Sequence, residues 1–269
     1  MALPSFAIII PARYESTRYP GKPLVELRGA GGASKTLIQR SWECASSVPG
    51  CAGVWVATDD DRIANAVEDF GGQVIMTSRS CANGTERCAE AAAKLDQAFD
   101  LVVNLQGDAP LTPTFAVEQM VERLDEDPES EMATVAVRCT KSVYAHLLAD
   151  AAEGRVGGTT AVINGASRAL YFSKRIIPYL PPEACGSDIV PVHLHLGLYA
   201  YRQSALRKYI EAPASELEML EGLEQLRFLD LGIPVAVVQL DPLSWDAIEL
   251  NNPSDVPTIE RVLGERGIE

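Results

Sequence analysis

The chain has 269 residues, 47% of them hydrophobic and 22% charged, and this balance argues against an intrinsically disordered protein. Its formal net charge is −14 at pH 7, so broad electrostatic binding to nucleic acid or to an anionic membrane is not expected. The six cysteines include no CxxC pair, which favours reduced thiols and a cytoplasmic location.

The first predicted element is a buried strand at residues 6–10 (FAIII), which ends at Pro11. Its apolar run is too short for a signal sequence or a membrane span, so we expect a cytoplasmic protein. The loop that follows, PARYESTRYPGKP, carries Arg13, Arg18 and Lys22. Because this loop has a single glycine, backbone amides alone cannot wrap a triphosphate. We therefore predict that its cationic side chains bind phosphate.

Strands and helices alternate over the next hundred residues. Hydrophobic spacing predicts helices at 35–48, 61–72 and 85–95, and β-rich runs predict strands at 53–60, 73–77 and 100–108. This alternation indicates a parallel sheet with helices on both faces. Ligands of such sheets bind beyond the carboxyl ends of the strands, where the loops after Ile10, Thr58, Thr77 and Leu105 would lie.

The second half is less regular. We predict a strand at 132–139, a hairpin within 154–174, a loop and strand at 181–202, one acidic helix at 215–232, a strand at 234–240 and a terminal helix capped near Ser254. We expect one domain over residues 1–269. The region from about 135 to 200 would be an inserted, β-rich hairpin that carries a subunit contact.

Six motifs occur in a fixed order: PARYESTRYPGKPL, VATDD, NGTER, NLQGDAP, HLGLYAYR and LEQLR. Together they resemble the CMP-Kdo synthetases (3-deoxy-manno-octulosonate cytidylyltransferases), from about Phe6 to Val256. The resemblance implies a three-layer α/β fold like that of nucleotide-diphospho-sugar transferases. It also implies a homodimeric, magnesium-dependent enzyme of lipopolysaccharide biosynthesis that joins the anomeric oxygen of Kdo to the α-phosphate of CTP and releases pyrophosphate.

The same resemblance assigns the CTP site. Arg13 and Lys22 would clamp the triphosphate, and Ser16, Thr17 and Arg18 would shape the loop around it. The loop before the helix at 85–95 would receive cytosine and ribose, through Asn83, Gly84 and Arg87. An ordinary helix cap at Thr85 is the alternative interpretation of that motif.

The sugar-acid site is assigned by resemblance as well. Its residues would be Gln106, His195, Tyr199, Glu224 and Gln225. We expect the other glutamates of the acidic helix to be solvated and His193 to be structural.

Asp108 resembles the magnesium ligand of the family, so the predicted catalytic residues are Arg13, Lys22 and Asp108. The sequence departs from the family here, because Ala109 follows where a glutamate is common, and LNNPSDV replaces a motif like VDTPEDL. Asn251 therefore stands where a second metal-binding aspartate is expected. An amide oxygen can bind Mg²⁺ without adding charge, and Asp246 or Glu249 could compensate.

Three alternatives remain open. The acceptor could be 8-amino-Kdo, sialic acid or another nonulosonate in place of Kdo. A nucleotidyltransferase acting on a sugar 1-phosphate is disfavoured, because those enzymes usually carry a GGxGTRL loop. A non-catalytic homologue is favoured only by Asn251.

Overall fold

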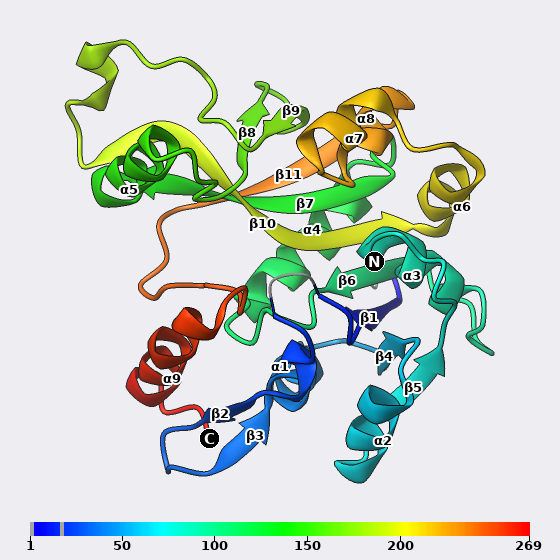
Figure 1. Ribbon diagram of the computed structural model, residues 1–269. Coiled ribbons are helices and arrows are strands. Elements are labelled where there is room, and N and C mark those ends of the chain that lie inside the picture. The colour runs from blue at the N-terminus through cyan, green and yellow to red at the C-terminus, as the bar shows by residue number, and fades with distance from the viewer. Residues whose placement is uncertain (1–2, 17–18) are drawn as a thin grey trace. The chain divides into compact units, whose positions relative to one another are not determined.

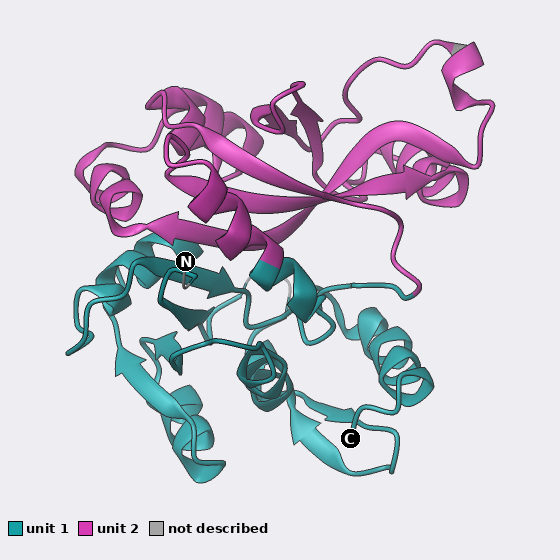
Figure 2. Ribbon diagram, turned by 180° about the vertical axis from the view of Figure 1, so that it is seen from behind, with its two compact units in different colours: residues 1–118, 245–269 teal, residues 119–244 magenta. Residues whose placement is uncertain are grey.

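The computed structural model describes residues 3–16 and 19–269, and their contacts divide the chain into two units. Unit 1 comprises residues 1–118 and 245–269, and unit 2 comprises residues 119–244 (Figure 2). The boundary falls within helix α4 (Thr114–Glu126).

Unit 1 contains four parallel strands in the order β6 (Leu101–Leu105), β1 (Phe6–Ala12), β4 (Val54–Thr58) and β5 (Gln73–Met76). Every residue of β1 and β6 is buried, as their continuous apolar runs predict for parallel strands covered on both faces. The strands predicted for this half of the chain are therefore confirmed.

Three helices of unit 1 pack on this sheet: α1 (Leu37–Ser46), α2 (Asp61–Asp69) and α3 (Gly84–Ala92). Each begins after a side chain that accepts a hydrogen bond from a backbone N–H of the first turn, which satisfies a donor the helix leaves unpaired. The predicted α/β class, a mostly parallel sheet covered by helices, is confirmed (Figure 1).

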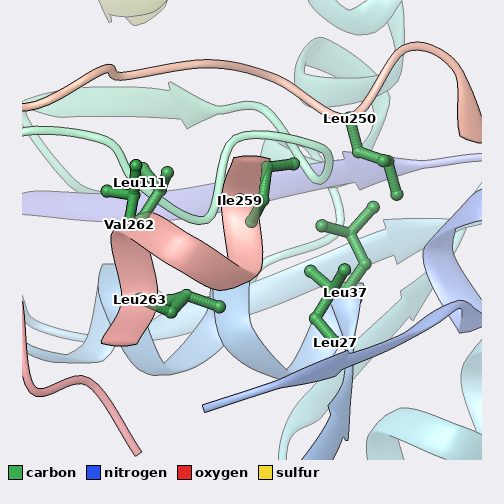
Figure 3. Close-up of a cluster of buried hydrophobic side chains, with 7 residues drawn as sticks. All are labelled: Leu27, Leu37, Leu111, Leu250, Ile259, Val262 and Leu263. Carbon is green, nitrogen blue, oxygen red and sulfur yellow. The ribbon is translucent and has the colours of Figure 1, made fainter. Parts of the chain in front are cut away.

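A hydrophobic cluster attaches the C-terminal segment to the rest of unit 1 (Figure 3). It joins the unpredicted hairpin of β2 (Glu26–Arg28) and β3 (Ser34–Thr36) to α1 and to α9 (Val256–Glu265). Its buried members are Leu27, Leu37, Leu111, Leu250, Ile259, Val262 and Leu263. Trp245 packs against the cluster and donates its indole N–H to the Leu111 carbonyl at 3.1 Å.

The predicted terminal helix exists, but its predicted cap is wrong. A 3-10 turn, Pro253–Asp255, precedes α9, and Asn252 and Asp255 form a capping box around it. The Asp255 carboxylate accepts hydrogen bonds from the backbone N–H groups of Asn251 and Asn252, at 2.9 and 2.7 Å. Ser254 therefore does not begin the helix, because Asn252 already provides the side-chain acceptor.

The sheet of unit 2 is centred on β7 (Met132–Thr140). β11 (Val235–Leu240) pairs with it in parallel, and β10 (Ile189–Arg202) pairs with it antiparallel. The hairpin of β8 (Thr160–Ile163) and β9 (Ala169–Ser173) adds to β10 at His193 and Leu194. The predicted strands and hairpin are confirmed, whereas the subunit contact of this region stays a prediction.

The helix predicted over 215–232 is wrong as a single element. It is divided into α7 (Glu216–Glu221) and α8 (Leu226–Asp230). Gly222 ends α7 with a φ of 61°, in the left-handed region that glycine adopts without a steric cost. The sequence pattern also gave no prediction for α5 (Lys141–Ala152) and α6 (Gln203–Glu211).

Candidate active site

The loop after β1 holds the predicted phosphate-binding cations. Arg13 is exposed, and the Ser16 hydroxyl accepts a hydrogen bond from the Tyr19 N–H at 3.4 Å. Gly21 has a φ of 71° and donates its N–H to the Tyr14 carbonyl at 2.8 Å, which closes the loop just before Lys22. Thr17 and Arg18, the other two residues assigned to this loop, lie outside the described residues.

Two residues missed by the sequence interpretation brace this loop. The guanidinium of Arg62 lies 3.3 Å from the centroid of the Tyr14 ring, and the same guanidinium is held by Asp60 at 2.6 Å. On the loop side, a Cβ placed on Gly21 would come within 3.0 Å of that ring. The start of α2 and the glycine thus fix the ring of Tyr14, and only glycine fits at position 21.

Lys22 and Asp108 meet at the carboxyl edge of the unit 1 sheet. The Lys22 ammonium forms a salt bridge with the Asp108 carboxylate and donates to the Leu250 carbonyl at 3.1 Å. The Leu250 N–H in turn donates to the Asp108 carbonyl at 2.8 Å. These contacts unite the loops after β1 and β6 with the late segment that contains Asn251. Three of the predicted triphosphate and metal residues are therefore neighbours.

The oxygen atoms at this place suit a magnesium ion. Asp108 offers a carboxylate, and Asn251 follows the residue that bonds to it. Residues 3–16 and 19–269 contain no group of three or more His, Cys, Asp or Glu side chains that could hold a metal alone. Magnesium in phosphoryl-transfer sites commonly uses one or two carboxylates together with substrate phosphates, so this donor set fits an ion bound with a nucleotide.

Asp246 and Glu249 could supply the negative charge that Asn251 lacks, and they differ in exposure. Asp246 is 65% exposed at its side chain and forms a salt bridge with Arg261 at 3.2 Å. Glu249 lies two positions before Asn251 and is half-buried. The salt bridge with Arg261 makes Asp246 the less available of the two.

The loop before α3 holds the predicted cytosine and ribose residues. Asn83 caps α3 by accepting a hydrogen bond from the Glu86 N–H at 2.9 Å, so a cap exists, but the alternative that placed it at Thr85 is wrong. Thr85 is fully buried instead. A Cβ on Gly84 would lie 3.4 Å from the side-chain amide nitrogens of Asn104 and Gln106, so this backbone runs close to the end of β6.

Arg87 is less accessible than its predicted role requires. It is 4% exposed, and its guanidinium forms a salt bridge with Asp59 at 2.9 Å and donates to the Thr77 hydroxyl at 2.5 Å. These contacts link α3 to the carboxyl ends of β4 and β5. Asp59 and Thr77 were missed, although both stand in the loops that the alternation of strands and helices places at this edge. A direct contact of Arg87 with a nucleotide stays a prediction.

Gln106 and Gly107 define the end of β6. The Gln106 side-chain amide donates to the buried Asn104 side chain at 3.3 Å. A Cβ on Gly107 would lie 2.9 Å from the Pro11 carbonyl, so the β6 and β1 loops can approach this closely only with glycine there.

The remaining predicted sugar-acid residues lie in unit 2, where His195 is buried beside Phe172 and Tyr199. The Thr134 hydroxyl donates to the Leu198 carbonyl at 2.8 Å and lies 2.9 Å from His195 Nε2. Because that hydroxyl has one proton, His195 Nε2 must be the donor in the second bond. Burial lowers the pKa of His195 to about 3, so the ring is neutral at physiological pH.

Tyr199 and Gln225 are in contact. The Tyr199 hydroxyl donates to Gln225 Oε1 at 3.4 Å, and the two residues are 4% and 1% exposed. Gln225 Nε2 is buried and has no hydrogen-bond partner among the described residues. A buried amide donor without a partner is costly, and a bound ligand oxygen would remove that cost. Glu224, the neighbour of Gln225, is half-buried.

The expectation that the other glutamates of this segment are solvated is wrong for Glu218. It is 7% exposed, and its carboxylate holds the Arg227 guanidinium in a two-pronged salt bridge, with distances of 2.6 and 2.7 Å. The sequence around Glu218 does not by itself predict that this glutamate is buried against an arginine. The Arg227 in LEQLR was the available signal, because a buried arginine requires an anion.

This chain is similar to known proteins over most of its length. The model of the cytidylyltransferase family matches residues 7–234. A 3-deoxy-manno-octulosonate cytidylyltransferase of Maricaulis maris is 41% identical, with 98% of each chain covered. An 8-amino-3,8-dideoxy-manno-octulosonate cytidylyltransferase of Shewanella piezotolerans is 40% identical, with 94% of this chain and 96% of that one covered.

A solved structure of CMP:2-keto-3-deoxy-manno-octonic acid synthetase in complex with CTP superposes with a TM-score of 0.82 at 34% identity. The match covers 97% of this chain and 99% of that one. In the described part of the chain, no helix has the length and apolar character that crossing a bilayer requires.

Proposed function

This chain belongs to the 3-deoxy-manno-octulosonate cytidylyltransferase (CMP-Kdo synthetase) family, and we propose that it transfers the cytidylyl group of CTP to Kdo. The anomeric hydroxyl of the sugar acid bonds to the α-phosphorus as the α,β-phosphoanhydride bond breaks. Pyrophosphate leaves with the bonding electron pair, and the hydroxyl proton passes to solvent. The products are CMP-Kdo and pyrophosphate.

One observation carries this proposal: the joint position of Lys22, Asp108 and the segment at Leu250. Phosphoryl-type transfer depends on positioning and on charge neutralisation more than on a covalent partner. In this proposal Lys22 and Arg13 hold the phosphate oxygens and oppose the charge that builds on the leaving pyrophosphate. Asn83 and Gly84 hold the cytidine.

We further propose that Asp108 holds a magnesium ion, with the Asn251 amide as a neutral second ligand. When bound, the ion would neutralise phosphate charge and polarise the α-phosphoryl group. The Lys22 ammonium must then exchange its Asp108 partner for phosphate oxygens. The partial exposure of both side chains, 16% and 20%, supports such an exchange.

As the family resemblance implies, we assign contacts with the sugar acid to Gln106, His195, Tyr199, Glu224 and Gln225. The unpartnered Nε2 of Gln225 supports a ligand oxygen as its acceptor. Neutral His195, which already donates from Nε2, would hold the neighbouring rings of Phe172 and Tyr199 in place rather than transfer a proton.

8-amino-Kdo is the second candidate acceptor, because a relative with that name is 40% identical while a Kdo enzyme is 41% identical. Pyrophosphate release from CTP and Mg²⁺, with Kdo, 8-amino-Kdo and N-acetylneuraminate offered separately, distinguishes the acceptors. Release with Kdo alone is the expected result. No release with any acceptor, in the wild type and in Asn251→Asp, would overturn the proposed reaction.

A homodimer remains part of the proposal. Exposed apolar side chains within residues 135–200 support a subunit contact there, among them Leu148, Leu170 and Tyr179, which are 47%, 58% and 85% exposed. Light scattering coupled to size exclusion should give twice the mass of one chain. Tyr179→Glu should shift that mass toward the monomer.

A further inference from the structure

We infer that Glu218 and Arg227 are positioning residues for the sugar-acid subsite, because their buried ion pair fixes the segment that carries Glu224 and Gln225. This inference rests on the proposed function. Neither residue is assigned any contact with the substrate.

The ion pair of Glu218 and Arg227 makes its hydrogen bonds within unit 2. Glu218 Oε1 accepts from the Tyr209 hydroxyl at 3.1 Å and from Arg227 Nη2, and Oε2 accepts from Arg227 Nε and from the Ser215 N–H at 3.3 Å. The guanidinium also donates from Nη1 to the carbonyls of Tyr209 and Ala212, at 3.2 and 3.4 Å. It lies 3.9 Å from the Tyr209 ring centroid.

These partners come from three different helices. Tyr209 is near the end of α6, Glu218 is in α7, and Arg227 is in the first turn of α8. The segment between α7 and α8 starts at Gly222, whose left-handed backbone reverses the chain. Arg227 therefore ties the far end of this turn back to α6 and α7, at a point two residues beyond Gln225.

The backbone carries this constraint to the subsite. The Arg227 N–H donates to the Glu224 carbonyl at 3.3 Å, and Gln225 is the residue that precedes α8. The side chain of Gln225 then extends to Tyr199 through its Oε1, which leaves Nε2 as the buried donor. A small rotation of α8 would move that donor away from its ligand, and misplacement by about 1 Å can cost a factor of about 100 in rate.

Unit 2 offers a matched control pair. Arg168 holds Asp127 with three hydrogen bonds of 2.8 to 3.1 Å, and Asp127 is 8% exposed. This pair connects the residue before β9 to the segment after α4, and the hydrogen bonds of Arg168 and Asp127 go to neither α7 nor α8. The contact of β9 with α7 lies at the other end of the strand, where the Ser173 hydroxyl donates to Glu221 at 2.7 Å. A carboxylate-to-amide change is possible at both sites: Glu218→Gln and Asp127→Asn.

The experiment measures the KM for the sugar acid, the Kd for CTP by calorimetry and the urea denaturation of wild type, Glu218→Gln and Asp127→Asn. Both variants should lose stability. Only Glu218→Gln should raise the KM for the sugar acid, by about 10-fold or more, while its Kd for CTP stays within about 2-fold. Arg227→Lys, which keeps the charge but loses the planar fork, should give an intermediate KM.

An unchanged KM in active Glu218→Gln would overturn the inference, as would an equal rise in Asp127→Asn. If Glu218→Gln does not fold, Arg227→Lys decides by the same two criteria. A wild type that is inactive with every acceptor overturns the proposed function, and the positioning role falls with it. If the wild type is active on a sugar acid, the KM values of the variants test the positioning role separately from the proposed reaction.

Discussion

Two charged pairs, one in each unit, differ in how far they are buried. In unit 1, Lys22 begins a short 3-10 helix (Lys22–Leu24), Asp108 lies in the loop after β6, and their side chains remain 16% and 20% exposed. In unit 2, the Arg227 and Glu218 side chains connect helices and are 4% and 9% exposed. A partly exposed pair can exchange its partners for phosphate and metal, whereas a buried pair that has all its hydrogen bonds cannot.

This difference in exposure has different consequences for stability and for activity. Solvent-exposed ion pairs contribute about 0–1 kcal/mol to stability, while removal of one member of a buried pair costs about 3–5 kcal/mol. Replacing a member of the more exposed pair should therefore affect activity more than folding. Replacing a member of the buried pair should affect both.

The largest effect on stability should come from Arg227→Ala. It leaves the Glu218 carboxylate buried without its cation, so we expect a loss of about 3–5 kcal/mol in the free energy of unfolding. Circular dichroism in urea measures it. Lys22→Ala is the matched change in unit 1, and because its pair is 16% and 20% exposed it should cost less, about 1–3 kcal/mol. Equal losses would remove the distinction between the two pairs.

Asp108→Asn should give the largest loss of activity. Removing the carboxylate weakens the proposed magnesium site and leaves the Lys22 ammonium without its partner, so kcat/KM should fall by about 100- to 1000-fold. Pyrophosphate release measures this. Asp100→Asn, just before the amino end of the same strand, is the control and should keep full activity. A comparable loss in both variants would contradict a local role for Asp108.

The pH dependence of stability should be confined to unit 2 near neutrality, since all three histidines (His146, His193 and His195) lie there. The pKa of His195 falls from 6.5 in the unfolded chain to about 3 in the fold, so protons bind the unfolded state first. Stability is therefore complete above pH 6.5 and decreases as the pH falls toward 3. At pH 5 this group should cost about 2 kcal/mol.

The measurement compares urea denaturation of wild type and His195→Gln at pH 7.5 and pH 5. The wild type should lose about 2 kcal/mol more than the variant between the two pH values. An identical pH dependence would show that His195 is protonated as readily in the folded protein as in the unfolded chain.

The smallest effect concerns the helix cap next to the proposed cytidine site. Asn83→Ala should cost about 1 kcal/mol, as should Thr36→Ala at the cap of α1. Asn83→Asp keeps the cap, so its stability should match wild type, but the added negative charge should weaken CTP binding in calorimetry. Unchanged CTP affinity in Asn83→Asp would mean that Asn83 is only a cap.

The sequence predicts unit 1 well because its site residues follow parallel strands. Lys22, Asn83 and Asp108 stand in loops that a parallel sheet must bring to one edge, whatever the details of packing. The hairpin of β2 and β3 was missed because its strands, ELR and SKT, have too few apolar residues to show a period.

Unit 2 depends on contacts between residues distant in the sequence or hidden in a regular pattern. The acidic run from 215 to 232 has helical periodicity, yet Gly222 divides it, and the pattern alone cannot show which glutamate is buried. The bond between Thr134 and His195 joins two strands 61 positions apart. The family motifs identify the predicted sugar-acid residues. The contacts that hold them, such as the bond from His195 to Thr134, can be found only from the structure.

The positions of the tryptophans allow the unfolding of unit 1 to be followed separately by fluorescence. Trp42, Trp55 and Trp245 all belong to unit 1, and unit 2 has none. Intrinsic tryptophan fluorescence therefore reports the loss of structure in unit 1, around α1, β4 and the C-terminal segment, whereas far-ultraviolet dichroism reports both units. Non-coincident transitions from the two signals would identify a state in which one unit has unfolded while the other persists.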